Sequence, residues 1–216
     1  PVILGHEFVG TIERIDQIKY PHLKKGDRVV AEPLISCGSC EACRIGCQHV
    51  CKSLKLLGIH RNGGFAEYVS VPAEKVIRIS DAMPDKIAAL TEPFAVGFHV
   101  NSRAGIRNCD NVLVIGGGPI GLITGMVASV SGAANVVFAE VKQERIDQIR
   151  SFGFGVIDSR KEDVISEVGS NTVGEGFDVV FEVSGSRQGL DLAVQACKIR
   201  GTIVPVGFPA KVPEFD

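Results

Sequence analysis

A glycine-rich turn at Val112–Gly121 limits the possible folds of this chain more than any other feature. The run Val112–Ile115 is apolar and mostly β-branched, which is typical of a strand buried in a parallel sheet. Gly116, Gly118 and Gly121 then form the pattern G-x-G-x-x-G ahead of a stretch that predicts a helix. This order of elements predicts the first half of a βαβ unit.

Each position in the turn has a physical task if a dinucleotide binds there. Gly116 allows the sharp turn, Gly118 lets a pyrophosphate approach the backbone, and Gly121 lets helix and strand pack closely. Pro119 and Ile120 open the helix, whose free N–H groups favour a phosphate. We therefore expect all five residues to bind a cofactor, the alternative being a glycine-rich turn without a ligand.

The next predicted strand ends in an acid at Glu140, 19 residues after Gly121. A carboxylate there can accept hydrogen bonds from the adenosine ribose and would repel a 2′-phosphate, which predicts NAD rather than NADP. We expect Arg145 to lie along the adenine side. Lys142 or Arg145 could neutralise a 2′-phosphate if its side chain turned inward, which would favour NADP. Side chains in a solvated helical turn would leave the preference for NAD unchanged.

Strands and helices alternate after residue 111, which predicts a doubly wound parallel sheet. The expected strands are Val112–Ile115, Val136–Glu140, Gly155–Asp158, Asp178–Glu182 and Thr202–Val206. The expected helices are Ile120–Val130, Gln143–Phe152, Lys161–Val168 and Arg187–Ala196.

Four cysteines, Cys37, Cys40, Cys43 and Cys51, have the spacing Cys-x2-Cys-x2-Cys-x7-Cys. Four thiolates from one short loop suit a closed tetrahedral zinc site, which would be structural because it leaves no open coordination position. Disulfides or scattered buried thiols are the alternatives, and Cys47 is expected to be a bystander. The odd total of seven cysteines favours a reducing compartment, so we expect a cytoplasmic protein.

Other motifs before residue 111 are weaker when taken singly. His6 and Glu7 bring an imidazole and a carboxylate together, although a strand edge with one polar pair would read the same way. The residues after the Asn62–Gly64 turn alternate and predict a strand. Ile87–Ala104 predicts a helix interrupted at Glu92, where the acid precedes a proline, and a solvated helix-end acid is the simpler interpretation.

The net charge of −2 over 216 residues gives no reason to expect nucleic acid or a membrane as partner. The apolar run 112–130 is too short and too interrupted by glycine to span a bilayer. Since the chain starts at Pro1 without a methionine, we expect it to be an internal piece of a longer protein.

Taken together and in order, these motifs resemble the zinc-dependent medium-chain dehydrogenase/reductase family. The motifs are His6-Glu7, Gly26-Asp27-Arg28-Val29, the four cysteines, Gly63-Gly64-Phe65-Ala66-Glu67-Tyr68, Glu92-Pro93 and the Gly116–Gly121 turn. The acid at position 92 resembles the polyol, butanediol, threonine and sugar-acid branch, because liver-type enzymes carry a cysteine there.

The resemblance implies an α/β protein of two partial domains. Residues 1–93 would form a GroES-like, mostly β catalytic domain without its N-terminal part. Residues 94–216 would form a Rossmann cofactor domain without its C-terminal part.

It also implies a second, catalytic zinc. His6 would be a ligand, Glu7 would bind the metal or sit behind it, and Glu92 would hold the zinc or its bound water. The family's remaining cysteine ligand would precede Pro1, so the chain by itself is expected to be inactive.

The implied function is NAD-linked oxidation of a secondary alcohol in a polyol, diol, sugar acid or hydroxy amino acid by hydride transfer. The partners would be a small-molecule substrate and further copies of the chain in a dimer or tetramer. A zinc-free reductase or quinone reductase on the same fold, or a non-catalytic zinc-lobe binding module, are the alternatives.

Overall fold

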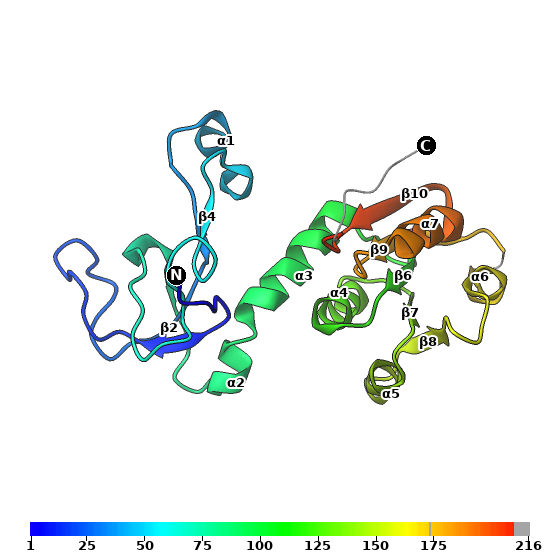
Figure 1. Cartoon of the computed structure of the whole chain (residues 1–216), viewed down its shortest axis with the longest axis horizontal. Coiled ribbons are helices and arrows are strands. Elements are labelled where there is room, and N and C mark those ends of the chain that lie inside the picture. Colours follow the sequence, from blue (N-terminus) through cyan, green and yellow to red (C-terminus); the bar gives the residue numbers. More distant parts are fainter. Residues whose placement is uncertain (173, 210–216) are drawn as a thin grey trace. The chain divides into compact units, whose positions relative to one another are not determined.

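The computed structural model describes residues 1–172 and 174–209 of the chain, and it separates into two compact units (Figure 1). The first unit comprises Pro1–Glu92 and the second Pro93–Asp216.

The first unit is built on a small antiparallel sheet of order β1-β2-β5. Its strands are β1 (Val9–Thr11), β2 (Arg28–Ala31) and β5 (Val76–Arg78). A second pair, β3 (Leu34–Ile35) and β4 (Lys55–Leu56), carries the cysteine loop between its strands. That loop contains α1 (Glu41–Arg44) and a 3-10 turn (Gln48–Val50), and another 3-10 turn (Ala73–Lys75) precedes β5.

Arg28, on the middle strand, binds the segment 80–85, which follows β5. Its guanidinium donates to the carbonyl oxygens of Ser80, at 2.9 Å, and Met83, at 2.7 Å, and it also pairs with the Asp85 carboxylate. Asp85 opens α2 (Asp85–Ala88). One side chain therefore fixes the entry into the helical stretch that carries Glu92.

The break in this helical stretch lies earlier in the structure than the sequence predicts. α3 (Thr91–Ala104) begins before Glu92 and contains Pro93, whereas the break falls at residues 89–90. Proline is tolerated here because its missing N–H would have no partner within the first turn of a helix.

The strand predicted after the Asn62–Gly64 turn is also wrong. Residues 66–71 belong to no strand, and no backbone hydrogen bond joins them to another described segment. An alternating sequence forms a strand only when a neighbouring backbone completes its ladder.

The second unit confirms the predicted doubly wound sheet, with strand order β10-β9-β6-β7-β8 and every pairing parallel. The strands are β6 (Asn111–Ile115), β7 (Asn135–Glu140), β8 (Gly155–Asp158), β9 (Phe177–Glu182) and β10 (Cys197–Pro205). The helices are α4 (Pro119–Val130), α5 (Gln143–Ser151), α6 (Val164–Thr172) and α7 (Arg187–Ala196). Strand order reverses between β6 and β9, which is where such sheets open a ligand crevice.

Helices cover both faces of this sheet (Figure 1). Alternate strand residues such as Leu113 and Val137 pack with α6 and α7, while Val112 and Phe138 pack with α3, α4 and α5. Because successive strand residues point to opposite faces, both sets can be apolar, as a parallel sheet covered on two sides requires.

β10 begins five residues earlier than predicted. Its pairing with β9 shifts register between Cys197 and Thr202, and Arg200 in that stretch has a φ of +65°. A bulge of this kind adds residues that follow no simple alternation, so the pattern did not reveal them. Across the described residues, every helix is too short or too polar to cross a bilayer.

Candidate cofactor crevice and metal centres

The glycine turn lies at the carboxyl end of β6 and is closely packed at Gly116 and Gly121. Gly116 has a φ of +98°, and a Cβ on it would lie 3.0 Å from the Ser184 nitrogen of the neighbouring loop. A Cβ on Gly121 would overlap the carbonyl oxygen of Gly116. Gly121 is therefore needed so that α4 can start against the turn itself.

Glu140 supports this turn from the adjacent strand. Its side chain is buried, with 4% of the residue exposed. One carboxylate oxygen accepts the Gly117 N–H at 2.7 Å, and the other accepts the N–H groups of Val141 and Lys142 at 2.7 and 2.9 Å. Burial raises the pKa of Glu140, but these backbone donors outweigh it and hold the net pKa below its ordinary value.

Arg145 turns toward the glycine turn. Its guanidinium lies 3.6 Å from the Glu140 carboxylate and 3.5 Å from the place where a Cβ of Gly118 would be. Lys142, in contrast, is exposed. Both cations line the crevice, and Arg145 is the one paired with the acid at the strand end.

The second unit has a crevice of about 580 Å³ at this edge of the sheet. All the cofactor-binding residues that the sequence predicts line it: Gly116, Gly118, Pro119, Ile120, Gly121, Glu140 and Arg145. The opposite wall consists of Ser184, Ser186, Gln188 and Gly189, none of which the sequence analysis identified. The glycine at 189 offered a signal, since a glycine in the first turn of a helix that follows a strand indicates close backbone packing.

In the first unit, the sulfur atoms of Cys37, Cys40, Cys43 and Cys51 lie within 4.8 Å of one another. The Cys40 sulfur lies 3.5 Å from that of Cys43 and 3.9 Å from that of Cys51. A tetrahedral zinc with bonds of about 2.3 Å requires sulfur separations of roughly 3.8 Å, so these residues fit the metal. Cys47 is not part of the cluster.

Hydrogen-bond donors in the same loop support thiolates. The pKa of Cys37 is lowered to about 6, chiefly by backbone donors at Ser39 and Cys40, whose N–H lies 3.4 Å from the sulfur. Burial, together with the neighbouring Cys40 and Cys51, raises the pKa of Cys43 to about 11. A buried thiol among other thiols becomes a thiolate most readily when a metal is bound.

His6, Glu7 and Glu92 form a second cluster, although 86 positions separate His6 from Glu92. Their ligand atoms lie within 4.8 Å of one another. Burial raises the pKa of Glu92, while the His6 imidazole lowers it and the Glu7 carboxylate raises it again. One nitrogen and two carboxylate donors suit a zinc ion and leave room for a further ligand.

The turn after Asn62 holds the segment that delivers His6. Gly63 and Gly64 donate N–H groups to the carbonyl oxygens of Ile3 and Gly5, both at 2.8 Å. The Asn62 side chain accepts the Ile3 N–H at 3.1 Å. The sequence indicated a turn at Asn62–Gly64, but the hydrogen bonds between this turn and the segment before His6 were not predicted.

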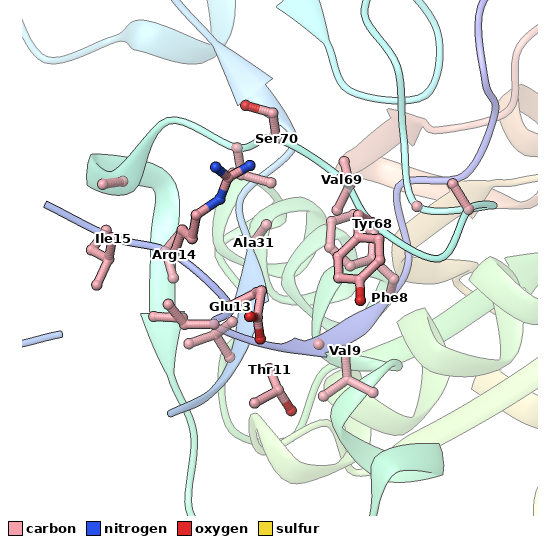
Figure 2. Close-up of a pocket in the computed structure, with 18 of the residues that line it drawn as sticks. Phe8, Val9, Thr11, Glu13, Arg14, Ile15, Ala31, Tyr68, Val69 and Ser70 are labelled. Atoms are coloured by element: carbon pink, nitrogen blue, oxygen red, sulfur yellow. The ribbon is translucent and has the colours of Figure 1, made fainter. Parts of the chain in front are cut away.

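His60 belongs to neither cluster, and no residue of either cluster lines the groove shown in Figure 2. The His60 Nδ1 accepts the Leu56 N–H at 3.1 Å and so serves its own turn. The groove holds about 600 Å³ and lies between the segment of Phe8 and β1, which begins at Val9, and the unpaired segment 66–71, with Tyr68 (Figure 2). None of His6, Glu7 and Glu92 lines it, so it is not the second metal site.

Comparison with known proteins agrees with the fold of the two units. The alcohol dehydrogenase GroES-like domain matches residues 1–81, and the zinc-binding dehydrogenase domain matches residues 119–216. An L-threonine 3-dehydrogenase of Anaeromyxobacter sp. (strain K) is 36% identical over 220 residues, covering 100% of this chain and 62% of the relative. The chain thus spans about three fifths of the length of the curated relatives it matches.

Solved structures show the same architecture. The alcohol dehydrogenase TADH of Thermus sp. ATN1 matches with a TM-score of 0.91 and 30% identity, over 100% of this chain and 66% of that one. A protein of Sinorhizobium meliloti 1021 solved with NADP matches with a TM-score of 0.91 and 31% identity, over 100% and 64%. The chain belongs to the zinc-dependent medium-chain dehydrogenase/reductase family.

Proposed function

We propose that this protein is a zinc-dependent, NAD-linked dehydrogenase that oxidises a secondary alcohol by hydride transfer. The observation that carries the proposal is the His6, Glu7 and Glu92 cluster in a chain that also has a dinucleotide-type crevice. Residues 1–93 would be the catalytic domain and residues 94–216 the cofactor domain.

The two clusters would hold two zinc ions with different tasks. The four cysteines would hold a structural zinc, because four thiolates close its coordination shell. His6, Glu7 and Glu92 would hold the catalytic zinc, which when bound supplies a Lewis acid that polarises an alcohol oxygen.

The chain's own residues prepare this second site. The half-buried Glu92 is kept near two other ionisable groups, and its raised pKa shows that burial disfavours its charge unless a cation is present. Gly63 and Gly64 hold the backbone ahead of His6, so that the imidazole is oriented before a metal arrives. Preorganised ligands reduce the entropy lost on binding.

The preference for NAD follows from Glu140. Its carboxylate lies among the crevice residues with a lowered pKa, so it is ionised at neutral pH and would repel a 2′-phosphate. Arg145 already faces this carboxylate and is partly neutralised by it. One structural relative holds NADP, so the choice of NAD rests on these residues and not on the comparison.

We propose a polyol, diol, sugar acid or hydroxy amino acid as the substrate, and the curated relative that acts on L-threonine supports the last of these. We further propose a homo-oligomer, either a dimer or a tetramer.

Metal analysis together with cofactor titration tests the proposal on this chain. The expected result is two zinc ions per chain and binding of NADH in preference to NADPH. One zinc ion that disappears with Cys51→Ser would contradict the catalytic site, and absence of zinc would favour a zinc-free reductase. An assay of NAD reduction with polyols, diols, sugar acids and threonine, on the longest natural form of the protein, would then identify the substrate.

A further inference from the structure

A second buried acid, Glu182, ends the strand on the other side of β6, and nothing in the proposed chemistry uses it. Only 3% of the residue is exposed. It lies at the carboxyl end of β9, across the point where strand order reverses, so its loop forms the crevice wall opposite Glu140.

The Glu182 carboxylate organises the loop that follows it. Its Oε1 accepts the N–H groups of Ser184 and Gly185 at 2.8 and 3.0 Å and the Ser184 hydroxyl at 2.5 Å. Three donors on one oxygen satisfy a buried polar group that would be costly without hydrogen-bond partners.

The arrangement continues into α7 with fixed directions. Because the Ser184 hydroxyl donates to the carboxylate, the Ser186 hydroxyl must donate to Ser184 Oγ across their 2.8 Å contact. Ser186 Oγ is then free to accept the Gly189 N–H at 2.9 Å and cap the helix. The acid thus orients a helix N-terminus through two serines.

The surrounding packing leaves this chain of contacts little freedom. A Cβ on Gly189 would lie 2.6 Å from the Glu182 carboxylate, and one on Gly207 would lie 3.1 Å from its other oxygen. The Ser184 backbone in turn abuts Gly116, at 3.0 Å from a Cβ placed there. The loop that Glu182 orders is therefore in contact with the glycine turn.

We propose that Glu182 is a positioning residue for the cofactor: it fixes the Ser184–Ser186 loop and the start of α7 as the wall of the crevice that faces the glycine turn. The proposal rests on the proposed use of that crevice for NAD. A wall held in one conformation raises affinity because no ordering cost remains when the ligand binds.

The test compares NADH dissociation constants, measured by the change in NADH fluorescence, for zinc-loaded variants of the full chain. Glu182→Met keeps the length of the side chain but removes every acceptor, and it should weaken NADH binding by about tenfold. Glu182→Gln retains one oxygen for Ser184 and Gly185, so it should stay within about threefold of the unchanged protein.

The matched control is Asp178→Asn on the same strand. Asp178 accepts the Asn111 N–H at 2.8 Å and pairs with Lys198, but it lies at the amino end of β9, away from the crevice. It should lower the melting temperature and leave the NADH dissociation constant unchanged. A merely structural role for Glu182 predicts the same behaviour for Glu182→Met.

Equal NADH affinity in the unchanged protein and Glu182→Met would overturn the positioning role of Glu182 but leave the proposed cofactor site intact. Failure of the unchanged protein to bind either NADH or NADPH would overturn both. If Glu182→Met does not fold, Ser184→Ala removes only the hydroxyl link. It should weaken NADH binding by about threefold, and unchanged affinity there would also overturn the inference.

Discussion

The backbone of Gly63 lies directly against the carbonyl group of Gly5, one residue before His6, and leaves no room for a side chain at position 63. Gly5 itself has a φ of +97°, a conformation that favours glycine. A Cβ on Gly58 would also lie 2.5 Å from the Gly5 oxygen. Gly58 and Gly63, both distant from Gly5 in the sequence, thus let their backbones approach it closely, one residue before His6.

Gly63→Ala should displace Gly5 and with it the imidazole of His6. We expect the zinc content to fall by up to one ion per chain while the four-cysteine zinc remains, and stability to fall by about 1–3 kcal/mol, as for an overpacked site. Cobalt substitution measures this directly, because a thiolate site and a nitrogen–oxygen site absorb differently.

Gly10→Ala is the matched control, since Gly10 lies four residues after His6 and a Cβ there meets nothing within 4 Å. It should retain both metals. Retention of both metals in Gly63→Ala as well would show that the glycine contact does not position His6.

Cys51→Ser should remove the zinc of the cysteine loop and lower the melting temperature. The Cys51 sulfur accepts N–H groups from Cys37, at 3.3 Å, and Ser53, at 3.4 Å, so its loss disturbs the loop from two sides. Release of zinc to a colorimetric chelator counts the ions. Cys47→Ser, in the same loop but outside the cluster, should release none, and an equal loss from both variants would contradict the four-cysteine assignment.

Sequence patterns predicted the sheet of the second unit well because its information is local. Apart from the start of β10, the strands there are largely apolar runs bounded by turn residues, and the glycine spacing marks one strand–helix junction. The acid at Glu140 was expected at the right place. The hydrogen bond that its carboxylate accepts from the Gly117 N–H was not expected, because a sequence pattern does not say which backbone donors face a side chain.

The first unit was harder to predict because its strands are short and depend on neighbours. Residues 66–71 alternate in the sequence but have no described backbone partner, so they remain an irregular segment. In the second unit, Glu182 was likewise predicted only as the last residue of a strand, although it accepts three hydrogen bonds from the following loop. Such tertiary contacts leave no periodic signal.

Glu140→Ser should narrow the preference for NADH over NADPH. The substitution removes the charge that opposes a 2′-phosphate and also leaves the Gly117 N–H without its acceptor, so NADH binding should weaken by about tenfold. Glu144 is an exposed acid four positions further on, and Glu144→Ser is the control. It should change neither the NADH nor the NADPH dissociation constant. Tighter binding of NADPH than of NADH by the unchanged protein would contradict the role of Glu140.

Asp158→Asn should lower stability in a way that depends on pH. Asp158 ends β8, and a hydrogen bond from the Arg160 side chain, helped by Lys161, outweighs burial and holds its pKa well below the ordinary value. A lowered folded-state pKa contributes stability above the unfolded-state pKa of about 3.9, and that contribution is lost as the pH falls toward the folded-state value. The melting temperature of Asp158→Asn, followed by circular dichroism, should therefore lie below that of the unchanged protein between about pH 6 and pH 8, and the difference should shrink below about pH 4.

Asp147→Asn is the control, because Asp147 is exposed and accepts its 2.9 Å hydrogen bond from the neutral Gln143. A difference for Asp158→Asn that stays constant down to pH 3 would show that packing, and not the ion pair with Arg160, accounts for the effect.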